Sequence, residues 1–182
     1  SIANAVRSDN KIEFYIKKYE NGLMSNYWFD EAKENDLLRL EGPLGTFFYR
    51  KSEAENIIFL ATGTGIAPVK AILEYISENQ NNFSKKKIWV IWGGRFSSDL
   101  FWKPEMVTEN LNFIPVLSRP DKNWNGAIGY VQNILLEQIN NLENAQVYAC
   151  GSNNMILSSK LLLSNYGLPK NNFYSDAFVN SN

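Results

Sequence analysis

Apolar and polar positions are arranged in two different ways along the chain. From residue 56 onward, short continuous apolar runs are followed by stretches in which apolar residues recur at helical spacing. Continuous runs are typical of strands that are covered on both faces. They predict strands at residues 56–61, 88–92, 113–117, 145–150 and 172–174, and helices at residues 66–76, 98–109, 131–139 and 153–165. Because these elements alternate, we expect an α/β fold with a doubly wound, parallel five-stranded sheet.

The first fifty residues follow a different pattern, without predicted crossover helices. Aromatic, aliphatic and β-branched residues predict strands at 11–17, 37–41 and 46–49, and residues 28–35 predict a short helix or loop. Glycine-containing turns separate these segments. We therefore expect residues 1–52 to be part of an antiparallel β-barrel and residues 53–182 to form the second domain.

A glycine loop, Thr62-Gly63-Thr64-Gly65, joins the first buried strand to the helix that follows. Glycines let a backbone approach a ligand closely, and the N-terminus of a helix offers N–H groups and a positive dipole end to phosphate. Pro68 fits the first helical turn, where a missing N–H costs nothing. The loop predicts a phosphate-binding site, and a tight strand-to-helix turn without a ligand is the alternative.

Two common forms of such a loop do not match. No Lys-Ser or Lys-Thr follows the glycines, as a P-loop ATPase requires. In the usual dinucleotide fingerprint a third glycine stands where this chain has Pro68, and an acidic residue follows the second strand, where this chain has Gly93-Gly94-Arg95. The loop therefore differs from those of ordinary ATPases and dehydrogenases.

Composition narrows the chemistry further. The net charge of −1 argues against a dedicated nucleic-acid partner, and no apolar run reaches the roughly 20 residues needed to span a membrane. The single cysteine, Cys150, excludes a disulfide within the chain and favours a reducing, cytoplasmic location. Histidine is absent, so Ser-His-Asp and His-ligated metal chemistry are excluded, and we expect no metal site. Any redox chemistry has to come largely from a bound cofactor.

Several motifs together resemble the ferredoxin–NADP reductase superfamily across essentially the whole chain. They are, in order, Ser1-Ile2-Ala3-Asn4, Gly22-Leu23-Met24-Ser25, Gly42-Pro43-Leu44-Gly45, Thr62 to Pro68, Cys150-Gly151-Ser152 and Phe173 to Phe178. Within the superfamily the chain is most similar to reductases that serve dideoxy-sugar synthesis for lipopolysaccharide O-antigens. The resemblance implies an FAD-binding barrel in residues 1–52 and an NAD(P)-binding domain in residues 53–182.

The resemblance assigns flavin-side roles to the front of the chain. Ser1 matches the last residue of the family's Arg-x-Tyr-Ser motif and is implied to lie near flavin N5 as a catalytic residue; the arginine and tyrosine are not in this chain, so whether it holds flavin stays open. The implied flavin-binding residues are Tyr15, Ile16, Lys17, Gly22, Leu23, Met24 and Ser25. The alternatives are plain strand residues at 15–17 and an ordinary Asn-Gly turn at 21–22.

The same resemblance assigns the nicotinamide nucleotide to the second domain. Its implied binding residues are Gly63, Thr64, Gly65, Pro68, Arg95, Ser118, Arg119, Gly151, Asp176 and Phe178, with Cys150 as a catalytic residue beside the nicotinamide. Ser118-Arg119 resembles a clamp for an adenosine 2′-phosphate, although an exposed or adenine-stacking arginine is the alternative, so the choice of NADPH or NADH stays open. A buried core cysteine and simple packing of the tail are the alternatives for Cys150 and for Asp176 and Phe178.

These assignments predict an NAD(P)H-dependent flavoprotein reductase. Electrons would pass from NAD(P)H through FAD to an iron–sulfur centre or a partner enzyme, with a [2Fe–2S] cluster expected only on a domain outside this chain. A pyridoxamine-phosphate dehydratase is the candidate acceptor that the resemblance implies. Two alternatives stay open: a free NAD(P)H–flavin reductase and a non-catalytic NAD(P)-binding module. The sequence leaves the final acceptor and the oligomeric state undecided.

Overall fold

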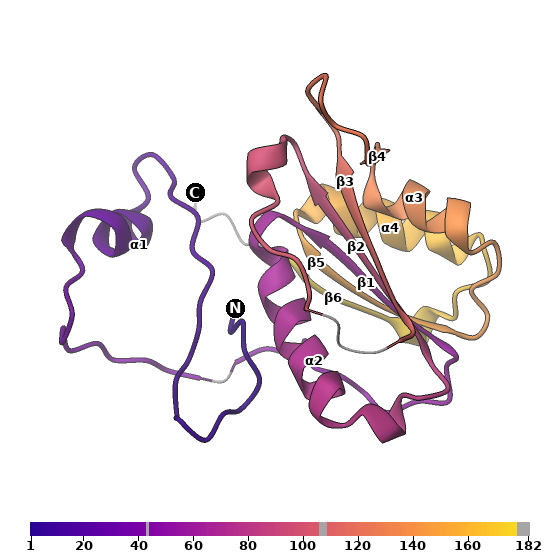
Figure 1. Cartoon of the computed structure of the whole chain (residues 1–182), viewed down its shortest axis with the longest axis horizontal. Helices are drawn as coiled ribbons and strands as arrows, with labels where there is room; N and C mark the ends of the chain where they lie inside the picture. The colour runs from indigo at the N-terminus through magenta and orange to yellow at the C-terminus, as the bar shows by residue number, and fades with distance from the viewer. Residues whose placement is uncertain (43, 106–108, 178–182) are drawn as a thin grey trace.

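A six-stranded parallel sheet lies at the centre of the structure (Figure 1), a computed structural model that describes residues 1–42, 44–105 and 109–177. The strand order is β4-β3-β2-β1-β5-β6, and every neighbouring pair is parallel. The strands are β1 (Asn56–Thr62), β2 (Lys87–Gly94), β3 (Leu111–Leu117), β4 (Ala127–Ile128), β5 (Ala145–Gly151) and β6 (Phe173–Ala177). The predicted doubly wound α/β sheet is therefore confirmed, and each of the five strands expected from residue 56 onward is present.

Helices cover both faces of the sheet, and the side chains of β1 show how. Ile57 and Phe59 pack with the apolar side of α2 (Ile66–Glu78), whereas Ile58 and Leu60 pack with α3 (Val131–Gln138) and α4 (Asn153–Ser164). Successive side chains of a strand point to opposite faces, so a strand with helices on both sides is apolar throughout. This explains the continuous apolar run that predicted β1.

The short strand β4 is the sixth strand that the sequence pattern did not predict. It pairs only with Val116 and Leu117, at the end of β3. Pro115, which has no N–H, lies just before this pairing and has no partner in β4. A two-residue strand leaves too short a pattern to be recognised in the sequence.

The predicted helix at residues 98–109 is wrong for the residues that the structure describes. Only a 3₁₀ turn forms at Ser97–Asp99, and residues 100–105 are neither helix nor strand; residues 106–108 lie outside the description. Pro104 lacks the N–H that an α-helix needs and would clash with the preceding turn. Instead, the rings of Phe101 and Trp102 pack against Trp92, at centroid distances of 5.2 and 6.3 Å.

The first segment of the chain also differs from its prediction. Residues 11–17, 37–41 and 46–49 form no ladder among the described residues, because a strand needs a backbone partner and the pairing there is a single antiparallel bridge between Ile2 and Phe14. The helical turn begins earlier than expected, with α1 (Leu23–Asn26) followed by a π-helical turn at Tyr27–Glu31. Figure 1 shows this segment beside α2, with α1 farthest from the sheet.

Candidate functional site

The carboxyl ends of the central strands meet at one edge of the sheet. The register pairs Thr62 at the end of β1 with Gly93 of β2, and Ala61 with Cys150 of β5. From β1 the chain moves outward through β2 to β4, and later returns to the other side of β1 with β5. A crevice opens where a strand order reverses in this way, and ligands of doubly wound sheets bind there. The structure thus brings Thr62–Gly65 and Cys150–Gly151 together at the expected place.

Two glycines allow the loops after β1 and β5 to touch. A Cβ on Gly65 would collide with the backbone carbonyl of Cys150, and a Cβ on Gly151, whose φ is +144°, would collide with the Thr62 hydroxyl oxygen. That hydroxyl accepts a hydrogen bond from the Ser152 N–H at 3.1 Å. The contact therefore needs glycine at both positions, for reasons that do not depend on any ligand.

The outer side of the glycine loop, by contrast, faces open space. Gly63 has a φ of +54°, and an added Cβ would meet no atom within 4 Å. Its carbonyl accepts a hydrogen bond from the indole N–H of Trp92 at 2.9 Å, which fixes the loop on the sheet. No side chain caps the N-terminus of α2, which follows directly. This geometry fits a pyrophosphate, because the backbone is accessible and the positive end of the helix dipole points at the opening.

A cavity of about 430 Å³ lies between this loop and the first segment of the chain. Its lining residues are Phe14, Tyr15, Ile16, Lys17, Gly63, Thr64, Ser98, Asp99 and Phe101. The ring of Tyr15 meets that of Phe101 edge to face at a centroid distance of 5.1 Å. Burial, and then the negative charge of Glu13, raise the pKa of Tyr15, so its phenol stays protonated at neutral pH. The volume suits part of a cofactor.

Sequence reasoning missed part of this cavity. Ser98, Asp99 and Phe101 line it from the segment that was predicted to be a helix, and that prediction gave no reason to expect their side chains in the site. Asp99 holds that segment in its 3₁₀ turn, because its carboxylate accepts hydrogen bonds from the N–H groups of Arg95 and Phe96 at 2.8 and 3.1 Å. The signal in the sequence is Asp99 itself, an acidic residue that follows the end of β2 and precedes Pro104, a pattern typical of a turn closed by a side-chain carboxylate.

Cys150 reaches the crevice through its backbone and not through its side chain. The thiol is fully buried, and this burial, with help from the negative charge of Asp176, raises the pKa of Cys150 to about 12. A thiol with such a pKa is neutral at physiological pH and is a poor nucleophile. Cys150 can therefore shape the crevice, but the structure offers no thiolate chemistry there. Ser1 itself is exposed to solvent.

Two exposed arginines stand on neighbouring loops at the same edge of the sheet. The Arg119 N–H donates to the Arg95 carbonyl at 2.9 Å, and the Ser118 N–H donates to the Gly94 carbonyl at 3.0 Å. Among the described residues neither guanidinium has an acidic partner within ion-pair distance. Because guanidinium groups suit phosphate oxygens, this pair is available to an anion.

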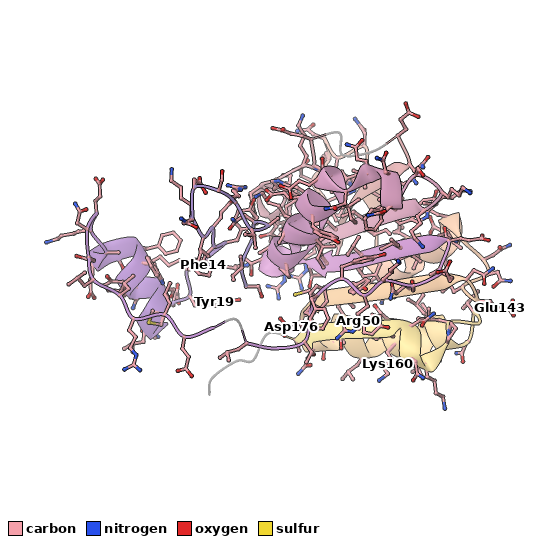
Figure 2. The ribbon with its side chains drawn as sticks, turned by 90° about the horizontal axis from the view of Figure 1, so that it is seen from below. Phe14, Tyr19, Arg50, Glu143, Lys160 and Asp176 are labelled. Atoms are coloured by element: carbon pink, nitrogen blue, oxygen red, sulfur yellow. The ribbon has the colours of Figure 1, made fainter. Side chains whose placement is uncertain are left out.

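Other predicted residues lie elsewhere. Gly22–Ser25 form the start of α1, and the Ser25 hydroxyl bonds to the backbone of Tyr19 and Gly22 within its own turn. They do not line the cavity, and Figure 2 shows α1 beyond Phe14 and Tyr19, away from the sheet. Pro68 is buried in the first turn of α2, and Asp176 is exposed on β6 next to Cys150 in register. Phe178 lies outside the described residues.

Comparison with known proteins matches both parts of this architecture. Residues 59–160 match the oxidoreductase NAD-binding domain, and residues 1–49 match the oxidoreductase FAD-binding domain. The chain therefore belongs to the ferredoxin–NADP reductase-like family of oxidoreductases, in which an NAD-binding domain follows a FAD-binding domain. The boundary between residues 52 and 53 stays a prediction. No helix in the described ranges is both long and apolar enough to cross a membrane.

Particular relatives narrow the comparison. The chain is 42% identical over 185 residues to the CDP-6-deoxy-L-threo-D-glycero-4-hexulose-3-dehydrase reductase of Yersinia pestis, covering all of this chain and 55% of that protein. The ferredoxin reductase of carbazole 1,9a-dioxygenase superposes with a TM-score of 0.80 at 22% identity, over 98% of this chain and 54% of that one. A ferredoxin–NADP⁺ reductase of Neisseria gonorrhoeae with bound FAD and NADP superposes with a TM-score of 0.75 at 19% identity, over 97% and 78% of the chains. The chain spans about half the length of the curated relative.

The buried, protonated state of Cys150 leads to a prediction about its reactivity. At pH 8 the native protein should react with a thiol reagent such as dithiobisnitrobenzoate at least about a hundred times more slowly than the same protein unfolded in guanidinium, because the thiolate is rare and inaccessible. The measurement is the absorbance of the released thiolate over time. Equal labelling rates in the native and unfolded protein would show that Cys150 is an exposed or activated thiol.

Proposed function

We propose that this chain contains the NAD(P)H site and part of the flavin site of a flavoprotein reductase. One observation carries the proposal: the cavity has residues of the FAD-binding match, Phe14 to Lys17, on one wall, and the glycine loop of the NAD-binding match, Gly63 and Thr64, on the other. A cavity between these two walls lets two cofactor rings approach each other. When bound, the nicotinamide and the flavin supply the hydride-transfer chemistry.

The residues of the chain then bind and orient these cofactors. In this proposal the backbone of Gly63–Gly65 and the N-terminus of α2 hold the dinucleotide pyrophosphate, and Thr64 faces the junction of the two rings. Tyr15, Ile16 and Lys17 form the flavin-side wall, and the edge-to-face rings of Tyr15 and Phe101 help to exclude water. No side chain needs to act as a general acid or base, which agrees with the absence of histidine. The contribution of the chain is alignment.

Other assignments from the sequence belong to the same proposal. Gly151, with the buried Cys150 beside it, would form the floor of the nicotinamide site. Ser1 is assigned to the flavin side, near N5, by its match to the family's flavin motif. Gly22, Leu23, Met24 and Ser25 would contact the flavin pyrophosphate, although in this structure they lie apart from the cavity. Asp176 and Phe178 are assigned to the tail that packs near the flavin.

The whole protein's role follows from its relatives only as a proposal. The name of the Yersinia relative describes a reductase that serves a dehydrase of a CDP-6-deoxyhexulose. By analogy, we place this chain in a reductase similar to CDP-6-deoxy-Δ3,4-glucoseen reductase, which would act in the cytoplasm in dideoxy-sugar synthesis. Its electrons would go through a [2Fe–2S] centre outside this chain to a pyridoxamine-phosphate dehydratase. A free flavin reductase and a non-catalytic NAD(P)-binding module are the competing functions.

Anaerobic reduction of FAD tests the reductase function directly. The protein is mixed with FAD and then with NADPH or NADH, and the visible flavin absorbance is followed over time. We expect bleaching at least about tenfold faster than in the same mixture without protein, because the two rings are held together. If the flavin bleaches at the same rate with and without protein while the nucleotide still binds, the non-catalytic module becomes the correct description of this chain.

The exposed arginine pair predicts that Arg119 contributes to the binding of NADPH and not to that of NADH. Arg119→Ala should weaken NADPH binding by about tenfold to a hundredfold, the usual range for one hydrogen bond to a charged group, and leave NADH binding unchanged. Isothermal titration with each nucleotide measures both constants. Arg39→Ala, which removes an exposed arginine from the first segment, is the matched control. Equal losses for NADPH and NADH would contradict a role in binding the 2′-phosphate.

A further inference from the structure

The two walls of the cavity belong to parts of the chain that are far apart in sequence, so something has to hold them at a fixed spacing. The sheet-side wall, Gly63 and Thr64, continues directly into α2. The other wall, Phe14 to Lys17, belongs to no helix and no strand ladder among the described residues. Its position therefore depends on side-chain contacts rather than on the sheet.

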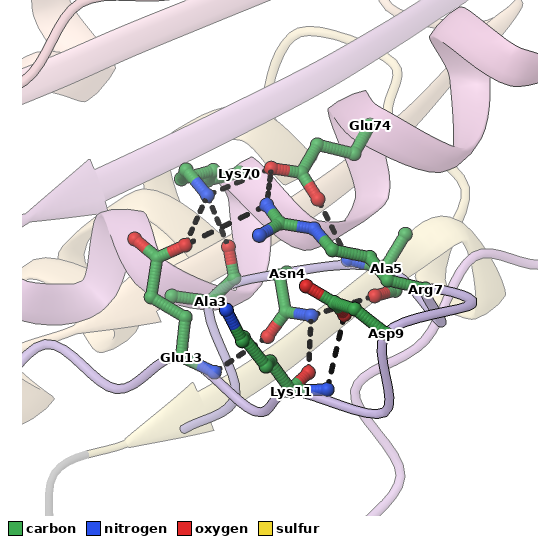
Figure 3. A network of polar contacts seen from close by, with 9 residues as sticks. All are labelled: Ala3, Asn4, Ala5, Arg7, Asp9, Lys11, Glu13, Lys70 and Glu74. Atoms are coloured by element: carbon green, nitrogen blue, oxygen red, sulfur yellow. Dashed lines mark hydrogen bonds and ion pairs between the residues drawn. The ribbon is translucent and has the colours of Figure 1, made fainter.

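Besides the contact of Tyr15 with Phe101, a group of polar contacts joins the residues just before this wall to two side chains of α2, Lys70 and Glu74 (Figure 3). The Lys70 ammonium donates to the Ala3 carbonyl at 3.0 Å and to the Glu13 carboxylate at 2.8 Å. The Glu74 carboxylate accepts from the Ala5 N–H at 2.9 Å and from the Arg7 guanidinium at 2.8 Å. Lys70 and Glu74 are one helical turn apart and also bind each other at 2.7 Å. This group of side chains joins residues 3–13 to α2.

Lys70 uses its full hydrogen-bonding capacity in this network. An ammonium group has three N–H donors, and here they go to Ala3, Glu13 and Glu74. Its side chain is only 12% exposed, so solvent screens these bonds little. A lysine held by three partners in different directions has one position available, which makes it a rigid link.

The segment that Lys70 holds is itself closed into a stiff loop. Asn4 is buried, donates from its amide to the Lys11 carbonyl at 3.0 Å, and accepts from the Glu13 N–H. The Ala3 N–H donates to the Glu13 carbonyl at 2.8 Å, beside the bridge between Ile2 and Phe14. Residues 3–13 therefore move as one unit, and Glu13 leads directly into the wall that begins at Phe14.

Charge supports the same connection. Burial opposes the charge of Lys70, but hydrogen bonds to Glu13 and Glu74 outweigh it and raise the pKa of Lys70 above its ordinary value. Burial likewise opposes the charge of Glu74, but hydrogen bonds from Lys70, the Ala5 N–H and Arg7 lower the pKa of Glu74. Both groups are therefore charged at neutral pH. The network has two carboxylates and two cations: the Arg7 guanidinium lies 2.8 Å from the Glu74 carboxylate and 3.6 Å from that of Glu13.

We propose that Lys70 is a positioning residue that sets the spacing between the Phe14–Lys17 wall and the Gly63–Thr64 wall of the cavity. It lies four residues into α2, about 6 Å along the helix axis from Ile66, which follows the glycine loop directly, at a rise of 1.5 Å per residue. The same rigid helix therefore carries one wall and clamps the other. Resting on the proposed function, this makes Lys70 the residue that controls how closely flavin and nicotinamide meet, without touching either.

A substitution that removes the clamp tests the proposal. Lys70→Met keeps the length and apolar stem of the side chain but removes its donors. We expect the amide protons of Ala3 and Ala5 to exchange with deuterium at least about tenfold faster, because residues 3–13 open locally from α2. The amide of Ile58, in the buried centre of β1, should exchange as in the original protein and reports on overall folding.

The same variant should separate binding from hydride transfer. The dissociation constant for NADPH should stay within about twofold, since the glycine loop and Arg119 are intact, while the rate of flavin reduction falls by about tenfold to a hundredfold through misalignment. Lys160→Met is the matched control, because Lys160 is exposed on α4 and Figure 2 shows it on the side of the sheet opposite α2. If Lys70→Met fails to fold, Glu13→Gln weakens the same link from the exposed side.

The outcomes discriminate clearly. Unchanged exchange at Ala3 and Ala5 in Lys70→Met overturns the positioning role, and so does a loss of NADPH affinity as large as the loss of rate. Faster exchange with unchanged affinity and slower flavin reduction supports it. If the original protein does not reduce flavin at all, the proposed function fails, and the exchange comparison alone still decides whether Lys70 fixes the wall.

Discussion

The site depends on a contact between two backbone loops that side chains would prevent. Gly65 packs against the Cys150 carbonyl and Gly151 against Thr62, so the ends of β1 and β5 close into one edge of the sheet. This contact turns the glycine loop so that Gly63 faces open space and α2 begins with its N-terminus at the opening. The crevice at the strand ends and the start of α2, which carries Lys70, follow from it.

Much of the sheet could be predicted because each central strand carries its own signal. In β1 the residues from Ile57 to Ala61 are apolar on both faces, and α2 repeats apolar residues every three to four positions. Predictions failed where structure depends on partners that a local pattern does not contain. The pattern of residues 100–105 predicted a helix, but Pro104 and the packing of this segment on Trp92 prevent one. The pattern of residues 11–17 predicted a strand, but this segment has a single bridge, at Phe14.

The candidate site was predictable to a similar extent. Gly63 and Gly151 could be predicted as site residues because glycine is needed there for the backbone conformation, which the local sequence indicates. Phe101 and Lys70 were not predicted as site residues, because their roles come from contacts with Tyr15 and Glu13, which are more than fifty positions away in the sequence. Cys150 was placed correctly at the strand end, yet its burial, which makes the thiol unreactive, depends on the packed sheet.

The most direct test of the account is to locate the nucleotide on the protein. In a ¹⁵N-labelled sample titrated with NADPH, the account predicts that the largest amide shifts occur at Gly63–Gly65, Gly93–Arg95 and Cys150–Ser152, around the carboxyl ends of β1, β2 and β5. Shifts that instead gather at residues 77–82, at the far end of α2, or that are absent at saturating nucleotide, would contradict it.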